Sequence, residues 1–429
     1  MKPIHYLLVL LFLIRAGAQS SPNVQQDRLE KTILELGTYG RDAQGQPNRV
    51  AFSDGDLEGR TYVMGLMREA GLEVRIDPAG NIIGTREGTD NGLKPIGLGS
   101  HIDMVPRGGN YDGCVGSLGA IEVVRTLQDA GIQTRHPLEV IIFSNEEGGV
   151  MGSRAMAGAL KPEALGVVNS TGYSMGEGIM RLGGDTTRLA GAIRSKGSFT
   201  AFLELHIEQG GILDREGEDI GVVEGIVGLR WWDVTIRGMA NHAGTTPMDL
   251  RRDALLAAAR FIQAVNEEAL AMEGKQVATV GRISALPGAP NVIPGEVVLS
   301  LEIRDLSDAV IDRLYEKIHS RAELIGKESG TSFSFLPLDT TGKPALTDPR
   351  IQKAVATAAG RLGLSHRQMQ SGAGHDAQDM ALITPVGMIF VPSKGGISHS
   401  PEEYTSPEDM ANGANVLLRT LLQLDAEWD

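Results

Sequence analysis

Two short apolar segments, residues 95–99 and 138–143, most constrain what this chain can fold into. Each is bounded by turn residues, which is typical of a buried strand. Apolar residues recur at helical spacing across residues 118–127, and Gly131 follows where that helix would end. A strand–helix–strand order predicts a mostly parallel sheet with both faces covered by helices. Ligands bind such sheets beyond the carboxyl ends of the strands, so we expect a functional site there.

The stretch from residue 229 to residue 340 shows a different order of elements. Two helical segments, 250–270 and 307–326, alternate with short β segments in the order β-α-β-β-α-β. That order is the split βαβ unit, a self-contained ferredoxin-like sandwich of two layers. Since helix–strand alternation resumes after it, we expect residues 229–340 to be inserted into an α/β catalytic domain made of residues 19–228 and 341–429. The expected strands of the insert are residues 232–237, 277–284, 297–304 and 332–336.

The first residues have the pattern of a secretory signal peptide. Lys2 precedes a run of nine apolar residues, 6–14, and the small residues 16–18 follow it. A membrane anchor is the alternative, but nine apolar residues fall well short of the roughly 20 that span a bilayer. We therefore expect residues 1–18 to be removed and the protein to be exported, periplasmic or secreted, with no membrane association.

Composition excludes several classes of protein. A hydrophobic content of 41% is ordinary for a globular chain and too high for a disordered one. The formal net charge of −14 argues against non-specific nucleic-acid binding, which needs an excess of Lys and Arg. One cysteine, Cys114, cannot form an internal disulfide, and we expect it to be a small buried residue.

Histidine and carboxylate residues gather at the ends of the expected strands. Imidazoles and carboxylates at the open edge of a parallel sheet make a suitable site for divalent metal ions. A single histidine in such a place is more often structural, but five such segments together favour metal binding. The segments are residues 99–103, 111–113, 145–148, 206–210 and 396–400.

The spacing within these segments suggests how the tasks are divided. The Asp103 carboxylate, two residues after His101, can accept the second imidazole N–H and so fix the tautomer. The adjacent Glu146 and Glu147 point to opposite sides of an extended segment. One of them can bind metal while the other acts as general base toward a metal-bound water. Asp112 could bridge two metal ions about 3.5–4 Å apart.

Six sequence strings carry a resemblance to a known family. They are GSHID at 99–103, HIEQG at 206–210, NHAGTTPM at 241–248, PNVIPG at 290–295, SGAGHD at 371–376 and GISHS at 396–400. On these strings the chain resembles the di-metal amidohydrolases that include N-carbamoyl-L-amino-acid hydrolase, β-ureidopropionase and allantoate amidohydrolase. These are relatives of the di-zinc aminoacylases and dipeptidases. The resemblance extends from about Leu29 to Leu422, and it implies that the inserted domain forms a homodimer.

The resemblance implies two metal sites that share one carboxylate. One ion would be held by His101, Asp112 and His206, and the second by Asp112, Glu147 and His399. The ligand types suit Zn, Mn, Co and Ni alike, with zinc the first expectation.

The resemblance also implies roles around the metals. Glu146 would be the general base and then the proton donor to the leaving nitrogen. His242 would stabilise the oxyanion and could reach the site of a partner subunit, while Asn291 and Arg304 would hold the carboxylate of a small-molecule substrate. Gln209, Gly374 and His375 would touch the substrate.

The function implied is hydrolysis of the linear C–N amide of a carbamoyl or ureido carboxylic acid, by hydroxide bridging the two metals. N-carbamoyl-L-amino acids and allantoate are such substrates. A histidine at position 206 favours this branch, because peptidase relatives usually have a carboxylate there. One alternative is a metallopeptidase or aminoacylase acting on dipeptides or N-acyl amino acids. Another is an exported binding protein that keeps the fold without catalysis.

Overall fold

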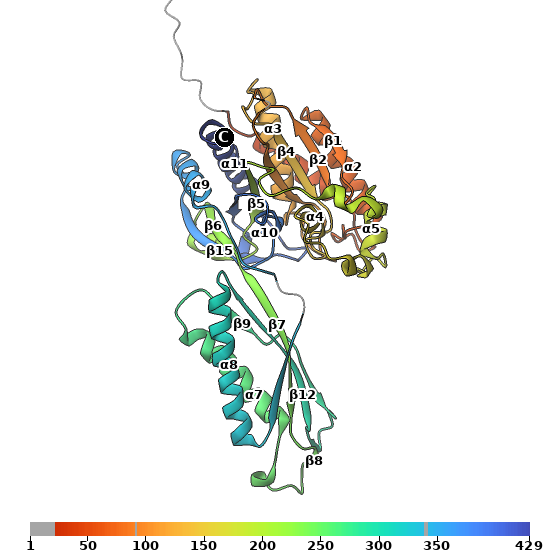
Figure 1. Ribbon diagram of the computed structural model, residues 1–429, viewed down its shortest axis with the longest axis vertical. Helices are drawn as coiled ribbons and strands as arrows, with labels where there is room; N and C mark the ends of the chain where they lie inside the picture. The colour runs from red at the N-terminus through yellow and green to blue at the C-terminus, as the bar shows by residue number, and fades with distance from the viewer. Residues whose placement is uncertain (1–21, 91, 339–341) are drawn as a thin grey trace, which may run out of the picture.

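The computed structural model describes residues 22–90, 92–338 and 342–429. The expected signal peptide, residues 1–18, lies outside the described residues, as does part of the expected domain boundary near residue 340. Figure 1 shows two lobes, a larger body that contains both ends of the described chain and an inserted domain that projects from it. No helix within the described ranges combines the length and the apolar character needed to cross a membrane.

The body is built on one nine-stranded sheet. Its strand order is β1-β2-β4-β3-β5-β16-β6-β14, with β15 beside β6. The neighbours β4, β3, β5 and β16 are parallel to one another, whereas β1 and β2 are antiparallel at one edge and β6 is antiparallel to β16. The bounds are β1 Glu73–Ile76, β2 Ile82–Arg86, β3 Ile96–His101, β4 Leu138–Phe143, β5 Ala201–Ile207, β6 Ile220–Ile226, β14 Ala345–Leu346, β15 His366–Ser371 and β16 Val386–Val391. The predicted α/β class with a mostly parallel central sheet is confirmed.

Helices cover both faces of this sheet. On β4, Leu138, Val140 and Ile142 pack into one core, whereas Ile141 and Phe143 pack into a second core on the opposite face. Because both faces are buried, every residue of the central strands is buried, which explains why these strands are rich in apolar residues and do not alternate between apolar and polar ones. The first face carries α1 (Gln26–Leu36), α2 (Asp54–Glu69), α3 (Cys114–Asp129), α9 (Pro349–Arg361) and α11 (Pro407–Glu427), and the second carries α4 (Met151–Met156), α6 (Ile212–Glu216) and α10 (Asp376–Met380). The remaining short helices of the body are α5 (Met175–Arg181), η1 (Pro162–Gly166), η2 (Thr186–Ala192) and η4 (Lys394–Gly396).

The inserted domain has its own antiparallel sheet and its own core. The sheet order is β10-β12-β7-β13, with β9 beside β12, and two long helices pack against it. Its separate hydrophobic cluster includes Trp232, Phe261, Leu301 and Ile318. The bounds are β7 Gly228–Arg237, β9 Val277–Thr279, β10 Ile283–Leu286, β12 Glu296–Asp305, β13 Ser332–Pro337, α7 Ala254–Ala271, α8 Asp308–Ser329 and η3 Met248–Leu250.

Two predicted elements of the insert differ in the structure. The expected single strand 277–284 is two strands, β9 and β10, that both pair with β12. Thr279 pairs with Glu302 and Ile283 pairs with Leu299, so the three residues 280–282 lie opposite only two residues of β12. This extra residue is a β-bulge, and it interrupts the expected strand. The long helix begins at Ala254 rather than near residue 250, because the Asp253 side chain accepts the N–H groups of the first turn.

A small ribbon forms the end of the inserted domain that lies farthest from the body (Figure 1). It consists of β8 (Asn241–His242) and β11 (Val292–Ile293), with Val292 paired to His242. We call this ribbon the tip. The tip carries His242, from the string at 241–248. Asn291, from the string at 290–295, lies next to Val292 in the same tip.

Candidate metal centre

The carboxyl ends of the parallel strands bring the candidate ligands together. His101 is the last residue of β3, and His206 lies one residue before the end of β5. Glu147 follows the end of β4, and His399 lies in the loop after β16. Because these four strands are parallel neighbours, their carboxyl ends meet at one edge of the sheet. Asp112 reaches the same edge from the loop before α3.

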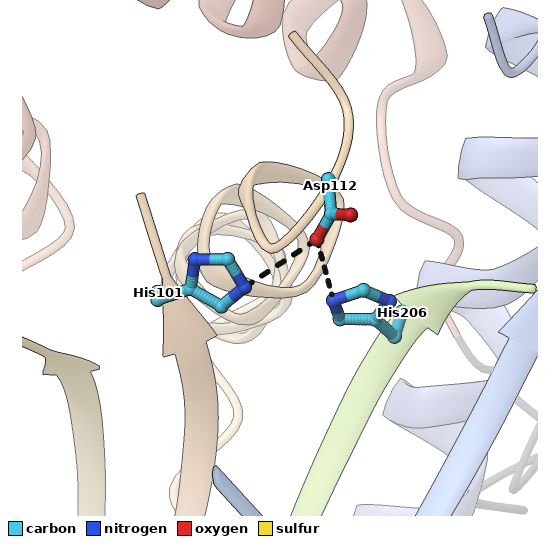
Figure 2. Close-up of side chains that lie close together, drawn as sticks. All are labelled: His101, Asp112 and His206. Atoms are coloured by element: carbon cyan, nitrogen blue, oxygen red, sulfur yellow. Dashed lines mark ion pairs between the residues drawn. The ribbon is translucent and has the colours of Figure 1, made fainter. Parts of the chain in front are cut away.

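One carboxylate oxygen of Asp112 faces two imidazoles (Figure 2). Asp112 Oδ1 lies 3.5 Å from His101 Nε2 and 3.2 Å from His206 Nε2. All three side chains are buried, and their ligand atoms are close enough to hold one metal ion.

The other oxygen of Asp112 faces a second group. Asp112 Oδ2 lies 3.4 Å from His399 Nε2, which in turn lies 3.5 Å from Glu147 Oε2. These three residues can also hold a metal ion. The structure therefore assembles both expected triplets, and Asp112 lies between them with one oxygen toward each.

Backbone carbonyl groups set the tautomers of the two buried imidazoles. His101 Nδ1 lies 3.0 Å from the carbonyl oxygen of Asp103, and His206 Nδ1 lies 2.9 Å from that of Ile207. A carbonyl oxygen only accepts, so each Nδ1 carries a proton and Nε2 is the ring nitrogen left to face Asp112. The backbone N–H of Gly113 donates to His206 Nε2 at 3.1 Å, in agreement with this assignment. Both imidazoles thus direct Nε2, the atom that binds a metal ion once it is unprotonated, toward Asp112.

Asp103 contacts different groups from those expected. Its carboxylate lies 3.7 Å from His101 Nδ1, within ion-pair distance but beyond hydrogen-bond distance, so the predicted hydrogen bond from the imidazole to the carboxylate is not formed. The carboxylate instead accepts the backbone N–H groups of Glu146 and Glu147, each at 3.2 Å. The physical reason is that the chain turns directly after β3. The backbone carbonyl of Asp103 therefore reaches the His101 imidazole, while the Asp103 side chain reaches the loop of Glu146 and Glu147. Asp103 therefore positions the two glutamates.

Glu146 lies beside the first triplet but belongs to neither. Its Oε2 atom is 3.7 Å from His101 Nε2, and its side chain is buried. Burial is the largest cause that raises the pKa of Glu146 well above its usual range, and the charges of Asp376 and Glu147 add to it. A carboxylate whose pKa is raised in this way is suited to taking up and returning a proton.

The charges of the site fit a divalent cation. Burial alone would raise the pKa of Asp112, but the imidazoles of His206 and His101 outweigh it and hold that pKa well below its usual range. Burial, followed by the charge of Asp112, raises the pKa of Glu147 to about 7. Glu147 Oε1 is buried without a hydrogen-bond partner among the described residues. Crowded carboxylates, an orphaned oxygen and imidazole nitrogens form a donor set that zinc and similar ions prefer.

Two of the expected substrate contacts lie against the metal triplets. Gln209 Nε2 donates to Asp112 Oδ2 at 2.6 Å. His375 is buried with its ring centroid 4.4 Å from that of His206, and its Nε2 atom lies 2.8 Å from Ser371 Oγ. Gly374 is exposed in the same loop, next to His375.

Arg304 lies at the end of β12 that adjoins the body. Its Nη1 donates to the carbonyl of Gly372 at 2.6 Å, so this contact joins the inserted domain to the loop of His375. Its Nε and Nη2 donate to the two carboxylate oxygens of Glu302, at 2.7 and 3.2 Å.

His242 and Asn291 do not lie near the metal triplets of their own chain. Both are exposed on the tip, at the other end of β12 from Arg304. Strand β12 spans ten residues, which corresponds to about 30 Å. Asn291 and Arg304 of one chain therefore cannot hold the same substrate carboxylate. Both residues can contact one carboxylate, as the resemblance implies, only if they come from different chains.

Two buried carboxylates of the site escaped the sequence analysis. Glu204 on β5 accepts Ser100 Oγ–H and the backbone N–H of Ala377, each at 2.8 Å, and its side chain lies close to His206 and His375. A glutamate between two leucines of a buried strand is a signal that could have identified it. Glu403 is buried beside Asp112 and His399, but nothing in its sequence neighbourhood distinguishes it from the exposed Glu402.

Known proteins similar to the chain have related activities. The sequence pattern of Peptidase family M20/M25/M40 matches residues 97–423. The chain is 43% identical over 406 residues to an N-carbamoyl-L-amino acid amidohydrolase of Geobacillus stearothermophilus, which covers 94% of this chain and 99% of that protein. It is 41% identical over 420 residues to a ureidoglycolate hydrolase of Arabidopsis thaliana, with 95% and 88% covered. A crystal structure of a hydantoinase/carbamoylase family amidase from Burkholderia multivorans has a TM-score of 0.88 at 38% identity, over 95% of this chain and 99% of that one.

Proposed function

The chain belongs to peptidase family M20/M25/M40, and on that basis we propose that it is a metal-dependent amidohydrolase. Its substrate is a carbamoyl or ureido carboxylic acid, of the N-carbamoyl-L-amino acid or allantoate type, and the bond cleaved is the linear C–N amide. The observation that carries the proposal is Asp112, whose two oxygens face two separate groups of candidate ligands. The histidine at position 206 in the first group, together with the named activities of the similar proteins, supports a carbamoyl substrate over a peptide.

The two triplets would hold two divalent metal ions. One ion would lie among His101, Asp112 and His206, and the other among Asp112, Glu147 and His399. Bound ions would supply an activated water at neutral pH and would polarise the scissile carbonyl. Zinc is the first expectation, and manganese, cobalt or nickel would suit the same ligands.

Glu146 would transfer the proton. It lies beside the first triplet without belonging to it, so its carboxylate is available to accept a proton from the attacking water. It would then donate that proton to the nitrogen of the leaving group. The Asp103 carboxylate holds the Glu146 backbone and so fixes the point from which the proton is transferred.

Arg304 would bind the carboxylate of the substrate. Its guanidinium adjoins the body through Gly372, and a planar fork suits a carboxylate with two oxygens. Gln209 and His375 would line the space between this carboxylate and the metals.

A homodimer would complete the site. His242 and Asn291 are exposed about 30 Å from Arg304 along β12, so they could act only on a substrate held by a second copy of the chain. The inserted domain also exposes large apolar side chains, as an interface between copies would require. They include Met248, Leu250, Leu256, Leu270 and Leu336, each more than half exposed.

Product analysis tests this function. The purified protein, supplied with zinc or manganese, would be given N-carbamoyl-L-amino acids, allantoate, dipeptides and N-acetyl amino acids in parallel. We expect ammonia and carbon dioxide to be released from the carbamoyl compounds or allantoate. Cleavage of dipeptides or N-acetyl amino acids without ammonia would support the peptidase or aminoacylase alternative. Binding without turnover of any of them would support a binding protein.

A further inference from the structure

Glu403 accepts hydrogen bonds from two loops that each carry a candidate metal ligand. Its Oε1 accepts the backbone N–H groups of Tyr111 and Asp112, at 2.9 and 3.0 Å. Its Oε2 accepts Ser398 Oγ–H at 2.9 Å and the backbone N–H of His399 at 3.3 Å. The side chain is 4% exposed, so solvent does not compete strongly for these contacts.

The two triplets differ in how their imidazoles are fixed. His101 and His206 belong to central strands of the sheet, whose ladders already define their backbone positions. His399 lies in a loop with a φ of +53°, a left-handed conformation that is uncommon for a residue other than glycine. A loop held in such a conformation needs contacts that stabilise it, and Glu403 supplies one to the backbone of His399 itself.

The packing around Glu403 is shaped to its carboxylate. A Cβ atom added to Gly109 would lie 1.9 Å from Glu403 Oε1, so only glycine allows the carboxylate to reach the Asp112 loop. Ser398 Oγ lies between Glu403 Oε2 and Asp112 Oδ2, at 2.9 and 3.0 Å. The hydroxyl has one proton, which it can donate either to Glu403 or to Asp112, so it lies within hydrogen-bond distance of both carboxylates.

We infer that Glu403 is a positioning residue that holds the Asp112 and His399 loops at a fixed separation and thereby preorganises the Asp112–Glu147–His399 triplet. The inference rests on the proposed metal binding, and it predicts that loss of Glu403 weakens that triplet more than the one formed with His101 and His206.

Glu403→Gln is the decisive substitution because it keeps the size of the side chain. An amide has one acceptor oxygen, whereas the carboxylate uses two, and the amide NH₂ would face N–H donors on one side. The backbone N–H groups of Tyr111 and Asp112, or that of His399, must then lose their acceptor. Glu402→Gln is the matched control, since it removes the same charge from the adjacent exposed residue.

The measurement is a titration of each metal-free chain with zinc, followed by calorimetry or equilibrium dialysis. We expect the parent and Glu402→Gln to bind two ions per chain. Glu403→Gln should bind the first ion as the parent does and the second about 10–100-fold more weakly, which is the usual effect of losing a group that orients a ligand. Glu403→Asp keeps both oxygens on a shorter chain and should recover part of the loss.

Three results would overturn the inference. If Glu403→Gln binds both ions with parental affinity, Glu403 does not position the triplet, although the proposed function stands. If both ions are weakened equally and the metal-free variant melts at a lower temperature, the role is general stability. If the parent itself binds fewer than two ions, the proposed function fails and the inference fails with it.

Discussion

The body and the tip of the inserted domain offer two contrasting ways to place functional side chains. In the body, His101, Asp112 and His206 are buried and fixed by strand ends or by hydrogen bonds to the backbone. On the tip, His242 and Asn291 are exposed on a two-stranded ribbon. The contrast shows that one chain assembles its candidate metal centre completely but leaves part of the proposed substrate site on a distant surface. Variants in the two regions should therefore fail in different ways.

The largest effect should come from the body. Glu146→Gln keeps the side-chain volume and removes no member of either triplet, but it removes the group that would transfer the proton. We expect kcat to fall by roughly 10²–10⁴-fold, the range that general acid–base catalysis contributes. Metal content, measured by atomic absorption, should stay at the parental level. Retention of most of the activity would contradict the assignment.

The tip should give a smaller loss that a second chain can repair. His242→Ala should lower kcat by roughly 10²–10³-fold through loss of a hydrogen-bond donor to the oxyanion, with metal binding unchanged. If the tip acts on the partner, dissociating and reassociating an equal mixture of Glu146→Gln and His242→Ala chains should restore about one quarter of parental activity. Half of the dimers would then contain one chain of each kind. In each of these, one of the two sites would combine an intact Glu146 with an intact His242, which gives one quarter of all sites. An inactive mixture would show that the tip does not act across chains.

A change of pH should affect the body and not the tip. A hydrogen bond to Asp112 is the largest cause that raises the pKa of His399 to about 9, so this imidazole is protonated in the metal-free chain at neutral pH. A metal ion must displace that proton. The affinity of the second ion should therefore rise with pH, by about tenfold per unit up to about pH 9. Zinc titrations at about pH 7 and pH 8 check this, and equal affinities would contradict it.

The smallest effect should appear where the two regions meet. Arg304→Lys keeps the positive charge but loses the planar fork, so we expect KM to rise by about tenfold while kcat changes less. The control is Arg282→Lys, which alters an exposed arginine of the same domain that pairs with Asp233. A fall in kcat at unchanged KM would show that Arg304 does not act by binding the substrate carboxylate.

Much of the architecture could be predicted because it depends on local patterns. Five of the six residues 138–143 are apolar because both faces of β4 are covered, so burial can be read directly from the segment. The family predicted from the six strings is confirmed, and Cys114 is buried as expected. The bulge opposite β12 was missed because the pairing partner, not residues 280–282 themselves, determines where a ladder is interrupted.

Within the site, the residue types were predictable but some of their contacts were not. A His-x-Asp spacing brings the aspartate near the imidazole, yet it does not determine whether the carbonyl or the carboxylate of Asp103 makes the contact. Glu403 binds backbone groups of residues close to 290 positions away in the chain, and no local pattern records such a contact. The separation of Asn291 from Arg304 likewise follows from the length and direction of one strand.

The unequal exposure of the two triplets implies different rates of metal exchange at the two proposed ion sites. The side chains of His101, Asp112 and His206 are at most 3% exposed, whereas that of His399 is 48% exposed. An ion held by buried ligands leaves slowly, because its departure requires the surrounding loops to open. An ion held partly by a half-exposed imidazole can exchange with solution while the rest of the site stays folded. The site formed with His101 and His206 would thus keep the metal ion that it bound during folding. The ion bound at the site formed with His399 would depend on which metal ions are available in solution.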